Sequence, residues 1–424
     1  MKEDLIQFIW RSKMLSSKNL KTTSGESIEI LQTGNLNTNQ GPDFLFAKIK
    51  LAEILWVGHV EIHVKSSDWL VHNHQEDPNY QNTILHVVWE HDQEMEWSGR
   101  ILACIELKDL IDQDVLHNYK LLMQNQQRIP CEHFLDRISP VVKSVQIERM
   151  MFERMEEKTE KCKRELSSMQ WDWEAILFHK IAHYIVAPIN CDAMDQLCRM
   201  LPYALISKHQ NDSFQLAALV FGTAGFLNEE LNDEYSRSLY NEFIFLQKKF
   251  KIQVMDSFQW KLLRLRPSHF PALRIAQLST LFSNHQRLFS RILETKQISG
   301  IYRLLEVVPP EYWQNHFSFD KNSNSLKKAS LGKQTKEIII INAICPLLFA
   351  YGAIYQQDII MDQAINYLQN IKPESNHISH MWKNFNFAFD HAGHSQGGIQ
   401  LFQRYCSEKK CTSCSIGNEI LKTA

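Results

Sequence analysis

The hydrophobic pattern of the chain changes once, near residue 110, and this change most limits the folds open to it. Before that point, short apolar runs alternate with turn residues, which is typical of β-strands: SIEILQ (27–32), PDFLFAKIKL (42–51), ILWVGHVEIHVK (54–65), TILHVVWE (83–90) and RILACIEL (100–107). Ahead of them, the spacing of Leu5, Ile6, Ile9 and Trp10 predicts a helix over residues 1–15. We predict an α+β domain over 1–135.

Beyond residue 110 helical periodicity dominates, so we predict a mostly α-helical domain over 136–424. Segment 139–166 predicts a long amphipathic helix, and segments 171–186 and 214–227 predict buried helices. The polar segment 316–335 predicts an exposed loop. The longest apolar run, 338–355, contains Asn342 and Pro346 and predicts a buried helix. Because a membrane span needs about 18 apolar residues in a row, we expect no membrane association.

The N-terminal residues and the overall charge bear on the protein's location and on its binding surfaces. Its first residues, MKEDLIQFIWRSKML, lack the features of an export signal, so we predict a cytoplasmic protein without disulfide bonds. The formal net charge is −2, so any surface that binds nucleic acid must be a local basic one.

The strand over residues 56–65 has one polar face. Because side chains alternate along a strand, Trp56, Gly58, Val60, Ile62 and Val64 share the face that we expect to pack on the core. The opposite face carries His59, Glu61, His63 and Lys65. Two imidazoles, a carboxylate and an ammonium in one row predict a site rather than a packing surface.

Asp43 begins the preceding strand, and a hairpin would bring it beside Glu61. Two neighbouring carboxylates repel each other when ionised, and a divalent cation relieves that repulsion. Hard oxygen ligands suit Mg²⁺ or Mn²⁺, which lowers the pKa of bound water. The alternative is structural, since a Pro-Asp pair is common at turns.

Pro42-Asp43 followed by Glu61-Ile62-His63 resembles the signature of PD-(D/E)XK nucleases, and the element order resembles their restriction-endonuclease-like αβββαβ core with a mixed sheet. The resemblance implies that Asp43 and Glu61 hold the metal. His63 stands where the motif has lysine. A neutral histidine can position or deprotonate water but lacks the fixed charge of lysine, a role left open for Lys65.

The whole chain resembles a bacterial family, common in Bacteroidetes, that is catalogued as domain-of-unknown-function family 2851. The resemblance rests on five stretches: GNLNTNQGPDF (34–44), GHVEIHVKSSDW (58–69), HNHQEDPNYQNTILHVVW (72–89), RLRPSHFPALRIAQL (264–278) and YCSEKKCTSCSIG (405–417). It implies an N-terminal α/β part and a helical remainder.

Further candidates for substrate or metal contact follow the polar strand. His72, His74 and Asp77 have spacings that can complete a metal shell or contact phosphate, although a plain surface loop would look the same. His86 lies on an apolar strand, and we expect it to be a core residue. In the helical part, Arg264, Arg266 and Arg274 stand near Phe270 and suit phosphate or base contacts; the alternative is a helix beginning at Pro271 with solvated arginines.

Three cysteines cluster near the C-terminus, as Cys406-x4-Cys411-x2-Cys414. In a reducing compartment such a trio predicts Zn²⁺ or iron–sulfur ligation. A fourth ligand must come from elsewhere, and we favour Cys131 in RIPCEHF, with His391 and His394 as alternatives for zinc. The pattern is similar to the [4Fe-4S] staple of some PD-(D/E)XK nucleases, which joins one distant cysteine to three clustered ones. Its role would be stability rather than catalysis.

These patterns lead to one functional hypothesis and two rivals. The first is a metal-dependent phosphodiesterase acting on DNA or RNA, with Asp43, Glu61, His63 and Lys65 as its catalytic residues. The second is a non-catalytic scaffold that binds nucleic acid or a protein partner, which the replacement of the motif lysine by His63 favours. The third, an iron–sulfur redox protein, rests on the cysteines alone.

Overall fold

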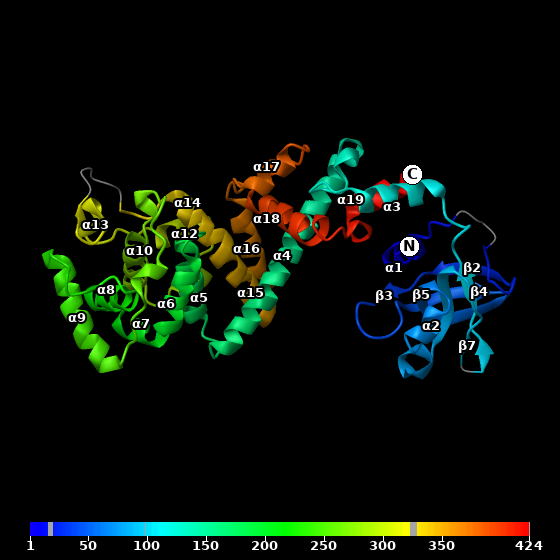
Figure 1. Cartoon of the computed structure of the whole chain (residues 1–424), viewed down its shortest axis with the longest axis horizontal. Coiled ribbons are helices and arrows are strands. Elements are labelled where there is room, and N and C mark those ends of the chain that lie inside the picture. Colours follow the sequence, from blue (N-terminus) through cyan, green and yellow to red (C-terminus); the bar gives the residue numbers. More distant parts are fainter. Residues whose placement is uncertain (16–19, 98, 323–328, 424) are drawn as a thin grey trace. The chain divides into compact units, whose positions relative to one another are not determined.

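The computed structural model describes residues 1–15, 20–97, 99–322 and 329–423 (Figure 1). The chain divides into two compact units. Unit 1 consists of Met1–Arg149, His380–Ala388 and Gly398–Ala424, and unit 2 consists of Met150–Ser379 and Phe389–Gly397. The division differs from the predicted boundary at 135/136, because the C-terminal segment that carries three cysteines packs into the N-terminal unit.

Unit 1 is built on a mixed sheet. The strands are β1 (Leu20–Lys21), β2 (Ser27–Gln32), β3 (Asn35–Leu36), β4 (Phe44–Leu51), β5 (Ile54–Lys65), β6 (Thr83–Glu90) and β9 (Cys104–Glu106). Their order in the sheet is β1-β2-β4-β5-β6-β9, with β3 also paired to β4. The pairs from β1 to β5 are antiparallel, whereas β5, β6 and β9 run parallel. A separate hairpin joins β7 (Glu96–Trp97) to β8 (Arg100–Ile101).

The polar face of β5 is covered by other elements, although the alternation of its side chains predicts an open face that carries a site. Helix α1 (Glu3–Ser12) packs against β5 and β6 and buries its apolar face, which includes the predicted Leu5, Ile6, Ile9 and Trp10. The crossover from β5 to β6 carries α2 (Asp68–Val71) and the short helices η1 (His74–Glu76) and η2 (Pro78–Tyr80). These elements leave Glu61 and His63 only 5% and 1% exposed.

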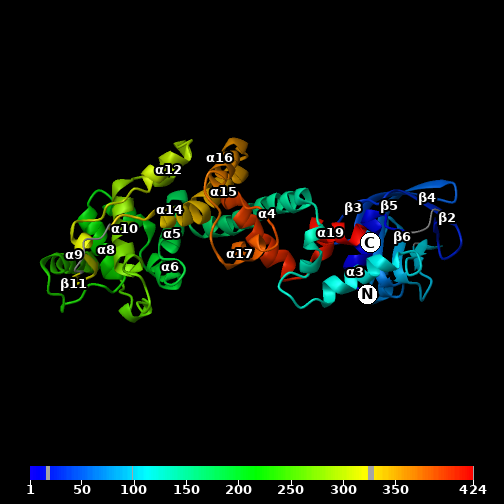
Figure 2. The same cartoon turned by 90° about the horizontal axis from the view of Figure 1, so that it is seen from above.

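The rest of unit 1 is helical. It consists of α3 (Gln113–Gln124), η3 (Glu132–Arg137), the first residues of α4 (Pro140–Ser168), η7 (Leu401–Cys406), η8 (Cys411–Ser413) and α19 (Ser415–Lys422). Helix α19 lies beside α3 in both views (Figures 1 and 2), and the side chain of Asn118 donates to the carbonyl of Ile420 (3.2 Å). The last residues of the chain therefore belong to the same fold as the first.

Unit 2 is a bundle of helices around one large apolar core. Besides the remainder of α4 it contains α5 (Trp173–Ile185), α6 (Cys191–Met200), α7 (Tyr203–His209), α8 (Ser213–Thr223), α9 (Glu234–Phe250), η4 (Ser257–Gln259), η5 (Pro267–His269), α10 (Pro271–Asn284), α11 (Leu288–Glu294), α12 (Ile298–Leu304), α13 (Tyr312–Asn315), the small β10–β11 hairpin (His316–Ser318, Lys321–Asn322), α14 (Lys333–Ile339), η6 (Ile340–Ile344), α15 (Cys345–Tyr355), α16 (Asp358–Gln369), α17 (His377–Lys383) and α18 (Ala392–Gln400). The last residues of α17 and of α18 are assigned to unit 1.

One helical stretch, Lys333–Tyr355, is long and apolar enough to cross a membrane by length and composition. However, 67% of its most apolar window is buried inside the protein, as is typical of a core helix. The prediction of a buried helix over 338–355 is therefore confirmed.

The coarse fold prediction is confirmed: a mixed sheet in the N-terminal region precedes a mostly helical part. Two details differ. RILACIEL is not one strand, because Leu102 and Ala103 separate β8 from β9. The predicted loop over 316–335 contains the β10–β11 hairpin and the start of α14, and its residues 323–328 lie outside the described part of the chain.

Candidate metal centre

Strands β4 and β5 bring Asp43 and Glu61 together. The antiparallel register pairs Phe44 with Val60, so Asp43 and Glu61 stand next to this pair on neighbouring strands. The backbone N–H of Asp43 donates to Glu61 Oε2 (3.0 Å), and the N–H of Ile62 donates to Asp43 Oδ2 (3.0 Å). Each carboxylate thus accepts a hydrogen bond from the backbone of the other residue or of its neighbour, as the predicted hairpin requires.

A turn-rich segment and a β-bulge set the position of Asp43. Gly34 has φ +88°, and a Cβ there would lie 2.7 Å from the carbonyl oxygen of Leu45, so glycine is needed. The Asn37 side chain donates to the carbonyl oxygen of Pro42 (3.0 Å). After Asp43 the register shifts, and Phe46 takes a positive φ of 59°. His59 Nδ1 accepts the Phe46 N–H (3.3 Å), so His59 supports the bulge.

Three histidines, His63, His72 and His74, form what we call the imidazole cluster. Their ligand nitrogens all lie within 4.8 Å of one another. His63 Nε2 lies 3.1 Å from His72 Nδ1 and 3.3 Å from His74 Nε2. Glu61 Oε1, the oxygen that the Asp43 N–H does not use, lies 3.2 Å from His74 Nε2 and 3.5 Å from His63 Nε2.

These separations match a tetrahedral metal shell. Zinc binds histidine nitrogen or carboxylate oxygen at about 2.0–2.1 Å, which spaces tetrahedral ligand atoms about 3.3 Å apart. Four of the six separations among these atoms are 3.1, 3.3, 3.2 and 3.5 Å. Glu61 lies outside the group of three histidines whose ligand atoms are all within 4.8 Å of one another, so it approaches the cluster only on the side of His63 and His74. The donor set of three imidazoles and one carboxylate therefore fits a divalent transition metal better than Mg²⁺, which prefers oxygen ligands.

His86 orients the central imidazole. His63 Nδ1 lies 2.8 Å from His86 Nε2. If His63 Nε2 keeps its lone pair for a metal, its Nδ1–H must donate to His86 Nε2, which makes His86 the tautomer protonated at Nδ1. In the described residues His86 Nδ1 is buried and has no hydrogen-bond partner. His86 is a buried residue, as predicted, and it also positions the site.

Aromatic rings pack around the cluster. The Tyr80 ring stacks on His74, with centroids 4.0 Å apart, and the buried Trp69 ring lies 5.3 Å from His74 and 5.5 Å from His86. His63 and His74 are buried, whereas His72 is exposed. Solvent or a substrate can therefore approach the cluster at His72.

Burial favours the neutral forms of Asp43, Glu61 and His63 when no cation is bound. It raises the pKa of Asp43 to about 7, with a further contribution from Glu61, and raises the pKa of Glu61 to about 8. Burial, followed by the neighbouring His86, lowers the pKa of His63 to about 2. The lone pairs of neutral imidazoles are free to bind a metal, whose charge would in turn favour the ionised carboxylates.

Helix α1 contributes to this site in a way that the sequence did not predict. Gln7 Nε2 donates to Asp43 Oδ1 (2.9 Å). Glu3 is close enough to interact with His72 and His74, and burial raises its pKa. The acidic first turn of α1 is the ordinary pattern for a helix start, so no signal marked Glu3 or Gln7 as site residues.

A family model described as "Protein of unknown function (DUF2851)" matches residues 3–377. The chain belongs to this family. Searches of curated proteins and of solved structures found no match. The DUF2851 match includes every residue of the candidate metal centre, and it ends before Cys406, so the C-terminal trio lies outside the matched residues.

Two predicted residues of unit 1 have other partners in this DUF2851 protein. The Lys65 ammonium is half exposed and lies 4.0 Å from Asp92, so we withdraw its assignment as a substitute for the motif lysine. Asp77 caps η2 by accepting the N–H of Asn79 (2.9 Å), which gives it a local structural role.

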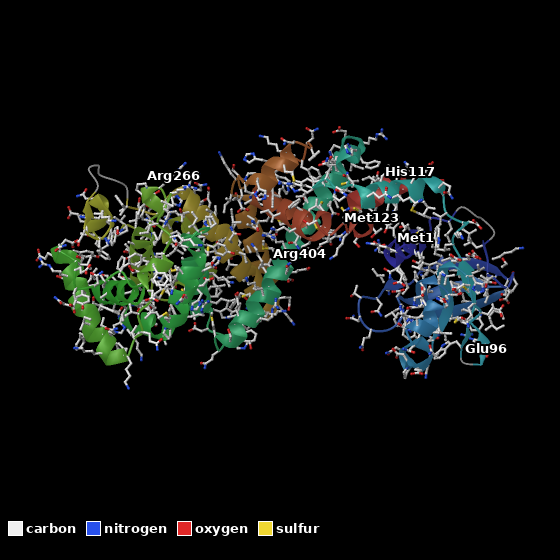
Figure 3. All side chains as sticks on the ribbon, viewed as in Figure 1. Met1, Glu96, His117, Met123, Arg266 and Arg404 are labelled. Atoms are coloured by element: carbon white, nitrogen blue, oxygen red, sulfur yellow. The ribbon has the colours of Figure 1, made fainter. Side chains whose placement is uncertain are left out.

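The three arginines differ from one another. Arg274 is buried and donates to Gln277 Oε1 (2.8 Å) and Thr335 Oγ1 (3.0 Å), which corrects its prediction as a substrate contact, because a guanidinium enclosed in this way cannot reach a substrate. Arg264 and Arg266 are exposed in unit 2 (Arg266 is labelled in Figure 3), so for them substrate contact stays a prediction.

The cysteine quartet consists of Cys131, Cys406, Cys411 and Cys414. All four are buried in unit 1 and line one small cavity together with Pro130, Tyr405, Lys410 and Gly417. The rings of His391 and His394, the alternative ligands, contact each other in unit 2, with centroids 3.8 Å apart. The sequence-based preference for Cys131 as the fourth residue therefore agrees with the geometry.

Proposed function

We propose that this protein is a metal-dependent hydrolase that cleaves phosphodiester bonds in nucleic acid. The observation that carries the proposal is the convergence of Glu61 Oε1 with the nitrogens of His63 and His74 at separations of 3.2–3.5 Å, next to the buried carboxyl of Asp43. Two neighbouring buried carboxyl groups beside imidazoles are typical of catalytic sites rather than of packing surfaces.

The strand order gives independent support. A helix, three antiparallel strands, a helical crossover and a parallel fourth strand (α1, β2, β4, β5, α2, β6) follow the αβββαβ order of the nuclease resemblance. Asp43 directly precedes the second of these strands and Glu61 lies on the third, where that resemblance expects the acidic pair. The resemblance concerns the arrangement of elements and two short motifs, and we carry over no further property.

In the proposed site each residue has one role. His63, His72 and His74 would hold a divalent cation such as Zn²⁺ or Mn²⁺, with Glu61 beside His63 and His74. The cation would lower the pKa of water and stabilise negative charge on phosphate. Asp43, with its pKa raised to about 7, accepts the proton of the attacking water. Gln7 and the Ile62 N–H keep the Asp43 oxygens in place, and His86 keeps the His63 ring in one orientation.

One experiment tests the proposal. The purified full-length protein is incubated with single- and double-stranded DNA and RNA in Zn²⁺, Mn²⁺ or Mg²⁺, and in chelator. We expect cleavage with a transition metal and its loss in chelator, in Asp43→Asn and in His74→Ala. Glu53→Gln is the matched control, because Glu53 is a carboxylate in the β4–β5 turn with 92% of its side chain exposed.

The second candidate, a non-catalytic scaffold, predicts a different result. It is favoured by His63, a buried neutral residue where the motif has lysine. Without that lysine, no permanently charged side chain stabilises the phosphate during cleavage. A scaffold binds nucleic acid, measured by fluorescence anisotropy, without metal-dependent cleavage of any of the four substrates. That outcome would exclude the hydrolase.

A further inference from the structure

The cysteine quartet joins two segments that lie about 275 residues apart in sequence. Cys131 precedes η3, whereas Cys406 ends η7, Cys411 begins η8 and Cys414 precedes α19. The four side chains are 7–9% exposed and face one cavity in unit 1. Scattered structural cysteines have no reason to meet in this way, and none of the four forms a disulfide.

Backbone N–H groups reach one sulfur of the quartet. The N–H groups of Ile416 and Gly417, in the first turn of α19, donate hydrogen bonds to the Cys414 sulfur. These N–H groups form the positive end of the helix, and N–H···S bonds are a common outer shell of thiolate-bound metals. A Cβ on Gly417 would lie 2.2 Å from the carbonyl oxygen of Cys411, so glycine permits this close approach.

Positive charge also faces the quartet. Lys410 lines the cavity, and Arg149 lies close enough to the Cys414 sulfur to interact with a charge there. The Arg149 guanidinium is held by the Tyr405 hydroxyl (3.0 Å) and the Ser413 carbonyl (3.2 Å), at the edge of the cysteine segment. These cations offset part of the negative charge that four thiolates would bring into a buried site.

The spacing of the sulfurs distinguishes two kinds of metal centre. One zinc ion with Zn–S bonds of about 2.3 Å holds its sulfurs about 3.8 Å apart. Within the described residues, the group of three or more ligand atoms that lie within 4.8 Å of one another is the imidazole cluster, and no three sulfurs of the quartet meet this limit. A cubane iron–sulfur cluster binds each thiolate to a different iron and spreads the sulfurs more widely.

We propose that Cys131, Cys406, Cys411 and Cys414 bind a [4Fe-4S] cluster. Each of the four thiols releases one proton to solvent and forms one iron–sulfur bond, and the oxidation state of the cluster does not change on binding. The proposal does not rest on the proposed hydrolase, because the quartet and the imidazole cluster share no ligand.

The cluster would brace helix α1. Thr412 Oγ1, between two of the cysteines, donates to Asp4 Oδ2 (3.4 Å), and Arg11 donates to the Thr412 carbonyl oxygen (3.2 Å). On the other side of the same segment Lys409 Nζ donates to the carbonyl oxygen of Met123 in α3 (2.6 Å; Met123 is labelled in Figure 3). Helix α1 in turn carries Gln7, which holds Asp43. The cluster therefore acts as a structural clamp on the N-terminal helix.

The test begins with the full-length wild-type protein, purified without oxygen. We expect iron and acid-labile sulfide in equal amounts, about four of each per chain, with a broad visible absorbance that dithionite bleaches. Cys131→Ser and Cys414→Ser should each lose most of the iron and sulfide. Cys104→Ser is the matched control, a buried cysteine of the same unit outside the quartet, and should keep both.

The wild-type measurement decides even if a variant fails to fold. Zinc without sulfide, or no metal after anaerobic purification and reconstitution with ferrous iron and sulfide, overturns the cluster. Full retention of iron in a Cys131→Ser protein with wild-type circular dichroism overturns the role of Cys131. Loss of the cluster without loss of zinc or manganese binding at the imidazole cluster supports two independent centres.

Discussion

Glu61 gives its two oxygens separate roles. Oε2 accepts the Asp43 N–H at 3.0 Å, which fixes the carboxyl plane, and Oε1 faces His63 and His74. Without a cation this arrangement is unfavourable, because a carboxyl that is 5% exposed loses hydration and gains no formal positive partner. Sites that are strained in the free protein and relieved by a ligand are typical of metal centres.

Replacing Glu61 should therefore stabilise the metal-free protein. The pKa of Glu61 is raised to about 8 in the folded state, above its usual 4.5. Below about pH 4 both states are protonated and the group has no effect; as the pH rises towards 8 the unfolded state ionises and folding stability is lost. Glu61→Gln removes this loss. In chelator at pH 8 we therefore expect the free energy of unfolding of the variant to exceed that of wild type by at least about 1 kcal/mol.

Thermal unfolding in chelator at pH 4 and pH 8 measures the effect. The two proteins should differ little at the lower pH, and added Zn²⁺ or Mn²⁺ should stabilise wild type but not the variant. A Glu61→Gln protein less stable than wild type at pH 8 in chelator would contradict the argument. Glu53→Gln, on the exposed turn, should match wild type throughout.

His86 holds the central imidazole of the site in one orientation. Its Nε2 accepts from His63 Nδ1 at 2.8 Å, so His86→Phe removes the acceptor while keeping an aromatic ring on β6. Loss of such an orienting partner typically weakens metal binding about 10–100-fold. His86→Gln offers a carbonyl acceptor and should recover part of the affinity. Competition against a chromophoric chelator measures both, and equal affinities for the Phe and Gln variants would show that His86 only fills space.

At the level of elements, the alternation of side chains predicted most of the sheet but not what covers it. The bounds of β2 and β6 agree with the predicted 27–32 and 83–90, because each run is apolar and β-branched and ends at polar residues. The amphipathic pattern of α1 shows which side of the helix is buried but not which face of the sheet receives it. The sequence therefore did not predict that Gln7 contacts the site or that His63 is enclosed.

Only part of the candidate site could be predicted from the sequence. Asp43 and Glu61 follow from two short motifs and period-two alternation, since both are local properties of strands. The assembly of His72 and His74 with His63 depends on the path of the crossover between β5 and β6, which local pattern does not specify. The withdrawn Lys65 shows the same limit, because Asp92, its partner, comes from the loop after β6.

Helices α5 and α6 of unit 2 carry a pH-dependent contact. His183 Nδ1 lies 2.9 Å from Asp195 Oδ1, and this hydrogen bond raises the pKa of His183 to about 9. Its stabilisation is present in full below the unfolded pKa near 6.5 and is lost as the pH rises through 9. Since both side chains are one-third or more exposed, we expect less than about 1 kcal/mol.

Asp195→Asn measures this contact. Wild type should be more stable than the variant at about pH 6, and the difference should vanish by about pH 10. Asp192→Asn, an exposed residue on the same helix, should not show this alkaline dependence. A difference that stays constant between the two pH values would mean that the pair contributes no charge-dependent stability.

At the scale of the molecule, unit 1 is closed by both ends of the chain. Its sheet and α1 come from the first residues, and η7, η8 and α19 come from the last. The contacts include Arg11 with the Thr412 carbonyl, Asn118 with the Ile420 carbonyl, and the Ser415 N–H with Gln146 Oε1 (2.9 Å). A unit assembled from distant segments loses stability when either is removed, because the remaining part exposes apolar surface that the missing part had covered.

A truncation after Gly397 should therefore loosen unit 1 and leave unit 2 folded. It removes η7, η8 and α19, including the apolar Leu401, Ile416, Ile420 and Leu421, each no more than 2% exposed. We expect the amides of β5 and β6 to lose much of their protection in hydrogen exchange, since α1 and α3 lose packing partners. Helix α10 of unit 2, measured in the same sample, is the internal control and should keep its protection. If β5 and β6 exchanged as slowly as in the full chain, the C-terminal segment would be a passive tail, and the clamp that we assign to the cysteine quartet would have nothing to hold.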